Sequence, residues 1–283
     1  MQSQFAPAVI ASSALTMGCA RLGSALTPLS RRECVALIEE AFALGVRHFD
    51  TASIYGQGDS ERFLGEALQR HRDRVCLSSK AGQRLTRRQA LMARFKPAIR
   101  WLAAHRSGLR DRVGVQRAKG LPRCFDPDAI EQSLLASLQR LRTDHLDVFY
   151  LHSPDAAVLD DAVLMARIER LRERGLFRAF GVSCDDATLA WKAAAHEAVQ
   201  VVQFDVNEVP DSAVLLQRLE HRGKRAVLRG FMFDSGSEGL AARFEAALRW
   251  PAVGGLIVGT TRVQHLRDNV SAFERAVNAR EPR

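Results

Sequence analysis

Residues 45–65 read GVRHFDTASIYGQGDSERFLG and combine a short strand, a tight turn and the start of a helix. A short apolar run ends in Asp50, and Tyr55 follows five residues later within a Tyr-Gly-Gln-Gly turn. A helix is expected to open at Ser60 and Glu61. The segment therefore places a carboxylate and a phenol just beyond the carboxyl end of a strand, where barrel enzymes hold their reacting groups.

Short apolar runs alternate with longer amphipathic stretches on both sides of this segment, which indicates repeated βα units. The strands are expected at 16–19, 46–49, 75–79, 146–151, 179–182, 201–205, 226–229 and 256–258. The helices are expected at 31–43, 60–70, 127–140, 160–173, 185–195, 212–222, 238–248 and 263–277. Eight such units predict an α/β protein, a (β/α)8 TIM barrel formed as a single domain over 1–283.

One long interruption breaks this rhythm at about 82–125, between the third strand and its helix. It contains Trp101 and several arginines and glycines. A loop after a barrel strand lies on the catalytic face, so we expect this one to shape a substrate pocket. A merely decorative insertion, with Trp101 as a buried anchor, is the alternative.

The chain carries 41 basic and 32 acidic residues, for a net charge of +9. The basic residues are spread along the sequence, and no nucleic-acid-binding motif accompanies them. A solvated, arginine-rich surface explains this balance, and attraction of a phosphorylated cofactor or an anionic substrate is the functional alternative. Nucleic acid is therefore not an expected partner.

Targeting signals and metal motifs are weak. The five cysteines are far apart and form no CxxC pair, which argues against a metal site and favours reduced thiols in a cytoplasmic protein. Residues 16–19, TMGC, look slightly like a lipoprotein cleavage site, but no Lys or Arg precedes them and polar residues interrupt the apolar stretch. We expect a buried first strand there, and no segment that spans a membrane.

Four polar side chains stand at or just past predicted strand ends. Asp50 and Tyr55 follow the second strand, Lys80 follows the third, and His152 follows the fourth. Each alone is weak evidence, since a single His or Lys at such a place is more often structural or solvated. Consecutive strands are neighbours in a barrel, so the four groups are expected to converge.

The chemistry of this set is coherent. A tyrosine has an ordinary pKa of about 10, too high for easy proton traffic near neutral pH. The ammonium of Lys80 favours the phenolate and is expected to lower the pKa of Tyr55. Asp50 can pair with Lys80, and His152 can hydrogen-bond and orient a carbonyl oxygen.

These residues resemble the catalytic tetrad of the aldo-keto reductases, without substitution. The segments 125–130, 133–147, 152–155, 181–183, 203–207 and 259–262 also resemble that family, so the likeness spans nearly the whole chain. It implies reduction of an aldehyde or ketone to an alcohol, or the reverse, with hydride from a nicotinamide and a proton from Tyr55. It implies cofactor contacts from Gly18, Cys19, Asp50, Ser183, Cys184, Gln203, Arg229, Gly259, Thr260, Arg262, His265 and Asn269.

Three positions depart from the family pattern. Cys184 replaces an asparagine beside the serine that holds the nicotinamide carboxamide. Arg229 stands where an aromatic residue often stacks on the nicotinamide, and Gly259 stands where some members carry a lysine near the phosphate. Arg262 can form a fork with a phosphate at a helix start, which favours NADP(H), with NAD(H) as the alternative.

The resemblance implies a small-molecule carbonyl or alcohol as substrate, in a pocket formed by Tyr55, Trp101 and His152. We expect a monomer or weak dimer. A nicotinamide-binding sensor or regulatory subunit with little turnover is one alternative, and an isomerase or aldolase that uses Lys80 as a Schiff-base amine is another. No GxGxxG, GxxxxGK[ST], HExxH or GxSxG motif supports a different enzyme class.

Overall fold

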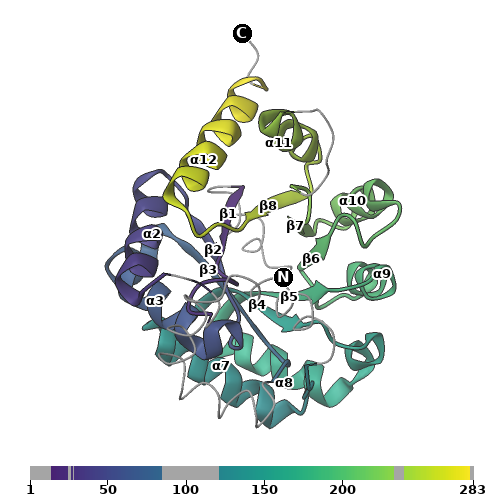
Figure 1. Cartoon of the computed structure of the whole chain (residues 1–283). Coiled ribbons are helices and arrows are strands. Elements are labelled where there is room, and N and C mark those ends of the chain that lie inside the picture. The colour runs from purple at the N-terminus through teal and green to yellow at the C-terminus, as the bar shows by residue number, and fades with distance from the viewer. Residues whose placement is uncertain (1–13, 25–26, 28, 85–120, 233–238, 281–283) are drawn as a thin grey trace.

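The computed structural model describes residues 14–24, 27, 29–84, 121–232 and 239–280. Eight parallel strands close into a barrel in chain order, so the predicted (β/α)8 architecture is confirmed (Figure 1). The strands are β1 (Leu15–Gly18), β2 (His48–Asp50), β3 (Cys76–Ala81), β4 (Leu146–His152), β5 (Phe177–Cys184), β6 (Val201–Asp205), β7 (Arg225–Arg229) and β8 (Val253–Val258).

Helices form a ring outside the strands (Figure 1). They are α2 (Arg31–Ala43), α3 (Asp59–Leu68), α7 (Pro127–Leu141), α8 (Ala162–Glu173), α9 (Ala187–Ala195), α10 (Ser212–His221), α11 (Leu240–Leu248) and α12 (Val263–Asn278). Shorter 3-10 turns lie at Tyr55–Gly58, Gln69–Arg74 and Ala156–Asp160. Local signals set several helix starts, because Ser30 forms a capping box with Glu33, and Asp126 caps α7 just before Pro127.

The strands that carry Lys80 and His152 extend further than the sequence predicts. Lys80 and His152 were expected just past their strands, but both lie inside the ladder, where Lys80 pairs with Tyr150 and His152 pairs with Ser183. A polar side chain does not end a strand when its backbone remains paired on both sides. Both side chains are therefore held by regular backbone and not by loops.

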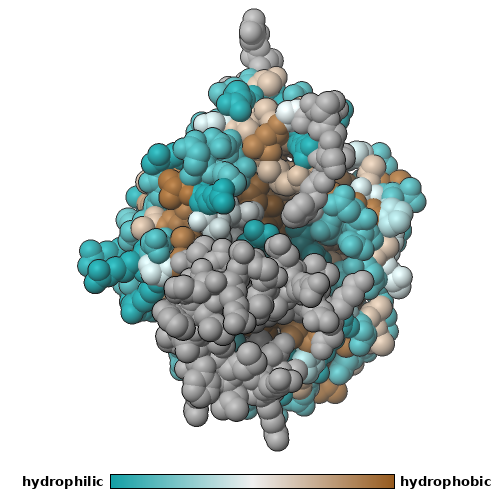
Figure 2. Space-filling view, viewed as in Figure 1, coloured by the Kyte–Doolittle hydropathy of each residue, from teal (hydrophilic) through white to brown (hydrophobic). Residues whose placement is uncertain are grey.

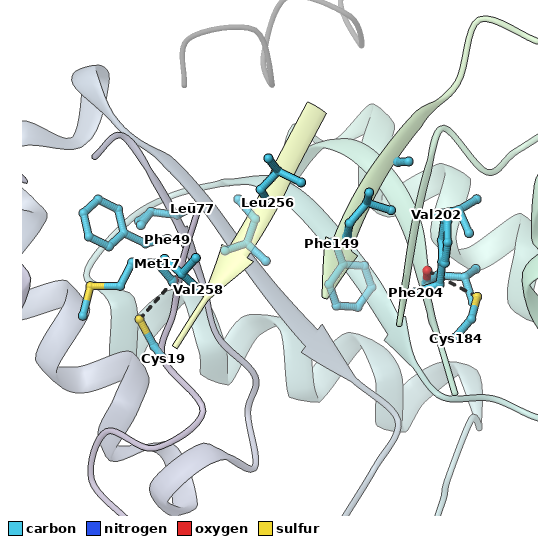
Figure 3. Packing of buried hydrophobic residues seen from close by; sticks show 14 of the residues in the cluster. Met17, Cys19, Phe49, Leu77, Phe149, Cys184, Val202, Phe204, Leu256 and Val258 are labelled. Carbon is cyan, nitrogen blue, oxygen red and sulfur yellow. Dashed lines mark hydrogen bonds between the residues drawn. The ribbon is translucent and has the colours of Figure 1, made fainter. Parts of the chain in front are cut away.

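The core has two layers, which follow from the alternation of side chains along each strand. Side chains that face outward pack beneath the helices, among them Met17, Phe49, Leu77 and Phe204 (Figure 3). A smaller inner layer fills the barrel and contains Cys76, Val148, Tyr150, Ala179, Val201 and Val227. Each fully buried large aliphatic or aromatic side chain contributes about 1.5–3 kcal/mol relative to exposure.

The surface is mostly hydrophilic along the outer rim of the described part, with smaller hydrophobic patches between (Figure 2). Many of its arginines form ion pairs, such as Arg31 with Glu66 and Arg267 with Glu40. In the described ranges, no helix has the length and apolar character needed to cross a membrane. The same ranges contain no group of three or more His, Cys, Asp or Glu side chains suited to a metal ion.

The long insertion after β3 has a closed base. Gln83 and Arg123 form an antiparallel bridge, the amide of Cys124 donates to the carbonyl of Gly82 at 2.7 Å, and the amide of Arg84 donates to Pro122 at 2.7 Å. The two ends of the insertion therefore lie side by side. Residues 85–120, including Trp101, lie outside the described residues, so the role predicted for this segment stays a prediction.

Candidate active site

The turn after β2 is built around glycine. Tyr55 opens a 3-10 turn in which Gly56, Gln57 and Gly58 all have positive φ angles, of 55°, 61° and 88°. A side chain at Gly56 would approach the carbonyl oxygen of Leu22 to 2.7 Å. Glycine is therefore required immediately after Tyr55, because the backbone turns into the left-handed region against another loop.

Buried hydrogen bonds anchor the helix that follows this turn. The hydroxyl of Ser60 lies 2.8 Å from that of Thr51 and donates to the carbonyl of Cys19 at 2.9 Å. Glu61 is fully buried and accepts hydrogen bonds from Ser79 at 2.6 Å and from Arg140 at 2.5 Å. The start of α3 is thus joined to the ends of β1, β2 and β3, which fixes the loop that carries Tyr55.

Asp50 and Lys80 form an ion pair inside the end of the barrel. Their residues are 4% and 1% exposed, and Lys80 Nζ donates to Asp50 Oδ1 and, at 2.8 Å, to the carbonyl of Thr51. A buried charge without its partner is strongly destabilising. The two residues therefore form one structural unit.

The second oxygen of the Asp50 carboxylate is also hydrogen-bonded. Oδ2 accepts from Ser78 Oγ at 2.9 Å and from Gln203 Nε2 at 3.0 Å. Gln203 Oε1 in turn accepts from Ser183 Oγ at 2.8 Å. The polar network thus joins β2, β3, β5 and β6 across the barrel end.

Tyr55, Lys80 and His152 converge as predicted. Lys80 Nζ lies 5.3 Å from the centre of the Tyr55 ring. The rings of Tyr55 and His152 meet edge to face, with centroids 5.9 Å apart and an interplanar angle of 88°. One reacting group could contact both the phenol and the imidazole in this arrangement.

The expected lowering of the Tyr55 pKa is wrong for the protein alone. Burial raises the pKa of Tyr55 above its ordinary value, and this outweighs the ammonium of Lys80, which acts in the expected direction. Burial also moves the pKa of His152 well below its ordinary value, aided by Lys80 and Arg229. At neutral pH the site therefore holds a protonated phenol and a neutral imidazole, a donor pair suited to a carbonyl oxygen.

A cavity of about 220 Å³ opens over these groups. It is lined by Gly18, Ala20, Asp50, Tyr55, His152, Ser183, Asp185, Gln203, Arg229 and Ile257. Seven of these residues were singled out from the sequence as catalytic or cofactor-binding. The barrel thus brings these seven residues together, although the first and last of them, Gly18 and Arg229, are 211 positions apart.

Arg229 lines this cavity and connects β7 to the end of β5. Its Nη2 donates to the carbonyl of Cys184 at 2.6 Å and to Asp185 Oδ1 at 2.8 Å. The helix predicted at 185–195 begins at Ala187, and Asp186 caps it by accepting from the amide of Leu189. Asp185 instead lines the cavity as the partner of Arg229.

The thiols of Cys19 and Cys184 do not line the cavity. Both side chains lie in the outer core, and their thiols donate to the backbone carbonyls of Met17 and Val182 (Figure 3). Burial raises the pKa of both thiols. Their side chains face away from the cavity lining, although the Cys184 backbone carbonyl reaches Arg229.

The residues expected to hold a cofactor phosphate form a second group at the end of β8. Gly259 and Arg262 are exposed in the turn before α12, as is His265 in its first turn, whereas Thr260 and Asn269 are buried. The backbone amide of Arg262 donates to Thr260 Oγ1 at 3.0 Å, and the side chain of Arg262, the N-cap residue, makes no capping hydrogen bond. Since Met17 pairs with Val258, this turn continues beside Gly18 at the cavity edge.

Sequence reasoning missed Ser78 and Asp185 as parts of the site. Ser78 stands two residues before Lys80, so strand alternation places both side chains on the same face, and this signal could have identified it. Asp185 had no comparable signal, because its pairing depends on Arg229, 44 residues away.

Comparisons with known proteins agree with this geometry. A family model described as the aldo/keto reductase family matches residues 14–229. The chain is 31% identical over 240 residues to a D-threo-aldose 1-dehydrogenase from a Pseudomonas species. The aligned region covers 82% of this chain and 69% of that protein.

Solved structures share the fold. An aldo-keto reductase structure from Pseudomonas aeruginosa superposes with a TM-score of 0.73 at 22% identity, covering 94% of this chain and 92% of that one. One from Klebsiella pneumoniae in complex with NADP and acetate superposes with a TM-score of 0.61 at 20% identity, covering 92% and 86%. With the family model matched over most of the barrel, the chain belongs to the aldo/keto reductase family.

Proposed function

We propose that this protein is an NADPH-dependent oxidoreductase that reduces an aldehyde or ketone to an alcohol, or catalyses the reverse. The observation that carries the proposal is the cavity that Asp50, Tyr55 and His152 line together, with Lys80 paired to Asp50. The proposed enzyme is a single-domain, cytoplasmic protein that acts as a monomer or weak dimer on a small molecule.

Each residue of the tetrad has a definite part. A bound nicotinamide would supply a hydride for the carbonyl carbon. Tyr55 donates a proton to the carbonyl oxygen, so that hydride and proton supply the two electrons and the two hydrogens that the carbonyl gains. The phenolate left on Tyr55 regains a proton from solvent. His152, held neutral by burial, donates a hydrogen bond that orients the oxygen. Lys80 lowers the cost of forming the Tyr55 phenolate, and Asp50 holds Lys80 in place.

The residues of the chain fit a nicotinamide dinucleotide. Ser183 and Gln203 offer a hydroxyl and an amide at the cavity wall, suited to a carboxamide. The uncapped start of α12 offers backbone N–H groups and the exposed Arg262 to an anion, which favours the extra phosphate of NADP(H) over NAD(H). Cys184 faces the outer core, so the carboxamide would rely on Ser183 and Gln203.

The substrate and the direction of reaction are best sought through relatives. The Pseudomonas relative is named a D-threo-aldose 1-dehydrogenase, an oxidative activity on a sugar. A panel of substrates should therefore contain aldoses with NADP+ and NAD+ as well as simple aldehydes and ketones with NADPH and NADH.

The decisive experiment follows absorbance at 340 nm over this panel for wild type and Tyr55→Phe. General acid catalysis is worth about 10²- to 10⁴-fold, so Tyr55→Phe should lose that factor in kcat. It should keep the cofactor affinity, because the phenyl ring remains. Near-wild-type turnover by Tyr55→Phe would show that another group donates the proton.

Two further measurements separate the alternatives. Binding of NADPH, followed by its fluorescence, together with no turnover on any substrate would favour the sensor function. Borohydride trapping of a carbonyl substrate on Lys80, lost in Lys80→Met, would favour Schiff-base chemistry.

A further inference from the structure

A line of buried polar side chains lies inside the barrel next to Asp50. Thr16, His48 and Ser78 are each at most 1% exposed. Thr16 Oγ1 lies 2.9 Å from His48 Nδ1, His48 Nε2 lies 3.3 Å from Ser78 Oγ, and Ser78 Oγ lies 2.9 Å from Asp50 Oδ2. The line therefore ends on the carboxylate that holds Lys80.

The strand register produces this line. Thr16 pairs with His48 across β1 and β2, and Asp50 pairs with Ser78 across β2 and β3. His48 and Asp50 are two residues apart on one strand, so they face the same side of the sheet. The interior of the barrel thus brings three strands' polar side chains into one chain of contacts.

Besides the longer contact of 3.4 Å from Ser78 Oγ to the carbonyl oxygen of Phe49, two arrangements of the hydrogens are compatible with these distances. In the first, Thr16 donates to Nδ1, Nε2–H of His48 donates to Ser78, and Ser78 donates to Asp50. In the second, Ser78 donates to Nε2 and the Asp50 oxygen loses that hydrogen bond. Hydrogen bonds to an ionised acceptor are roughly twice as strong as neutral ones, so the first arrangement prevails.

The imidazole stays neutral in this position. Burial lowers the pKa of His48 to about 4. Three charged groups also act on the pKa of His48. Asp50 on the same strand and Asp147 on β4 raise it, and Lys80 on β3 lowers it. A neutral ring has one donor and one acceptor nitrogen, which is what the directed line requires.

We propose that Ser78 is a positioning residue for the Asp50–Lys80 pair, and that His48, fixed by Thr16, directs the hydroxyl hydrogen of Ser78 onto Asp50. This inference rests on the proposed function, because the pair it positions is the one that acts on Tyr55. Lys80 occupies Oδ1 of the carboxylate, and Ser78 and Gln203 share Oδ2. Without Ser78, only the Gln203 amide among these donors holds Oδ2, and the carboxylate can rotate away from Lys80.

The kinetic test compares Ser78→Ala and His48→Phe with wild type. Losing a hydrogen bond to a charged group changes a rate by about 10- to 100-fold, so Ser78→Ala should lower kcat by that factor. KM for the carbonyl and Kd for NADPH should change little, because Ser78 does not line the cavity. His48→Phe should have a smaller effect, and His48→Gln, whose amide can still donate to Ser78, should recover most of it.

A double-mutant cycle and a matched control separate positioning from general damage. If His48 acts through Ser78, the double variant should be no slower than Ser78→Ala alone. Cys76→Ala alters the same interior layer, opposite His48, and should keep kcat close to wild type. Wild-type kcat in Ser78→Ala, or additive effects of the two substitutions, would overturn the proposal.

Nitrogen-15 NMR of the histidine rings tests the same line without turnover. The His48 signal, assigned by its absence in His48→Phe, should report protonation at Nε2. Protonation at Nδ1 would mean that Ser78 donates to His48, which would overturn the proposal whether or not the protein reduces carbonyls. An active wild type with an inactive Tyr55→Phe but an unaffected Ser78→Ala would reject the positioning role and leave the proposed function standing.

Discussion

The carboxylate of Glu61 accepts a 2.6 Å hydrogen bond from the hydroxyl of Ser79, the neighbour of Lys80 on β3. Its other oxygen accepts from Arg140 of α7 at 2.5 Å. One fully buried acid thus joins the helix after the Tyr55 turn to the strand that carries Lys80. The relative position of Tyr55 and Lys80 depends on this joint as well as on the barrel itself.

Glu61→Gln should therefore destabilise the protein. It leaves Arg140 without its buried counter-ion, and breaking such a pair costs about 3–5 kcal/mol in full burial and less here, since Arg140 is partly exposed. Urea unfolding measures the loss. Glu66→Gln on the same helix is the control: its pair with Arg31 is exposed, so its loss should cost less than about 1 kcal/mol. Equal stability of the two variants would contradict the role given to Glu61.

Ionisation of the tyrosines offers a direct optical test of burial. The chain has two tyrosines, Tyr55 and Tyr150, and burial raises the pKa of both above 10. Phenolate absorbance at 295 nm should therefore stay absent from the native protein up to about pH 10. After unfolding, the two tyrosines should ionise with the ordinary pKa of about 10. Raised pKa values also mean that stability is lost as the pH rises above 10. A native titration below pH 10, absent in Tyr55→Phe, would show that Tyr55 is less buried than described.

His48 should make the protein sensitive to acid. Its pKa is lowered from 6.5 to about 4, so its contribution to stability is complete above pH 6.5 and is lost as the pH falls toward 4. The shift corresponds to a loss of about 3 kcal/mol. The free energy of unfolding, measured by urea at both ends of this window, should fall less in His48→Gln than in wild type. His221→Gln, at an exposed position, is the matched control variant.

Thiol reactivity should single out Cys124. It is the half-buried cysteine, whereas Cys19, Cys34, Cys76 and Cys184 are buried. Burial also raises the pKa of Cys19, Cys76 and Cys184, which keeps them as thiols. A disulfide reagent near pH 8 should label one thiol fast, and Cys124→Ser should abolish that phase. Mass spectrometry that finds the fast label on Cys184 would contradict the placement of its side chain.

The sequence predicted the barrel because its signals are local and repeated. The helix at 31–43 was predicted to the residue from its amphipathic pattern, and in the structure a capping box of Ser30 and Glu33 marks its start. The strand boundaries were less certain, because Lys80 and His152 read as the first loop residues although their backbones stay paired. Polarity alone does not distinguish a strand end from a buried catalytic position.

The convergence of Asp50, Tyr55, Lys80 and His152 could be predicted, but the connections around these residues could not. The bond between Gln203 and Asp50 joins residues 153 positions apart, so it exists only after the barrel closes. The predicted direction of the Tyr55 pKa shift was wrong for a related reason. The sequence shows the partner of Tyr55, Lys80, but not how deeply the phenol is buried. The outward direction of the Cys184 thiol likewise follows from register, which no single segment encodes.

The closed base of the insertion after β3 has an evolutionary consequence. Because Gly82 and Arg84 pair directly with Cys124 and Pro122, the chain leaves the barrel and returns to it at one point. Segments attached in this way can lengthen, shorten or diverge without shifting Lys80 or the helix that follows. Selection can then act on the insertion as a separate module, because its changes need not displace Lys80 or the strands beside it.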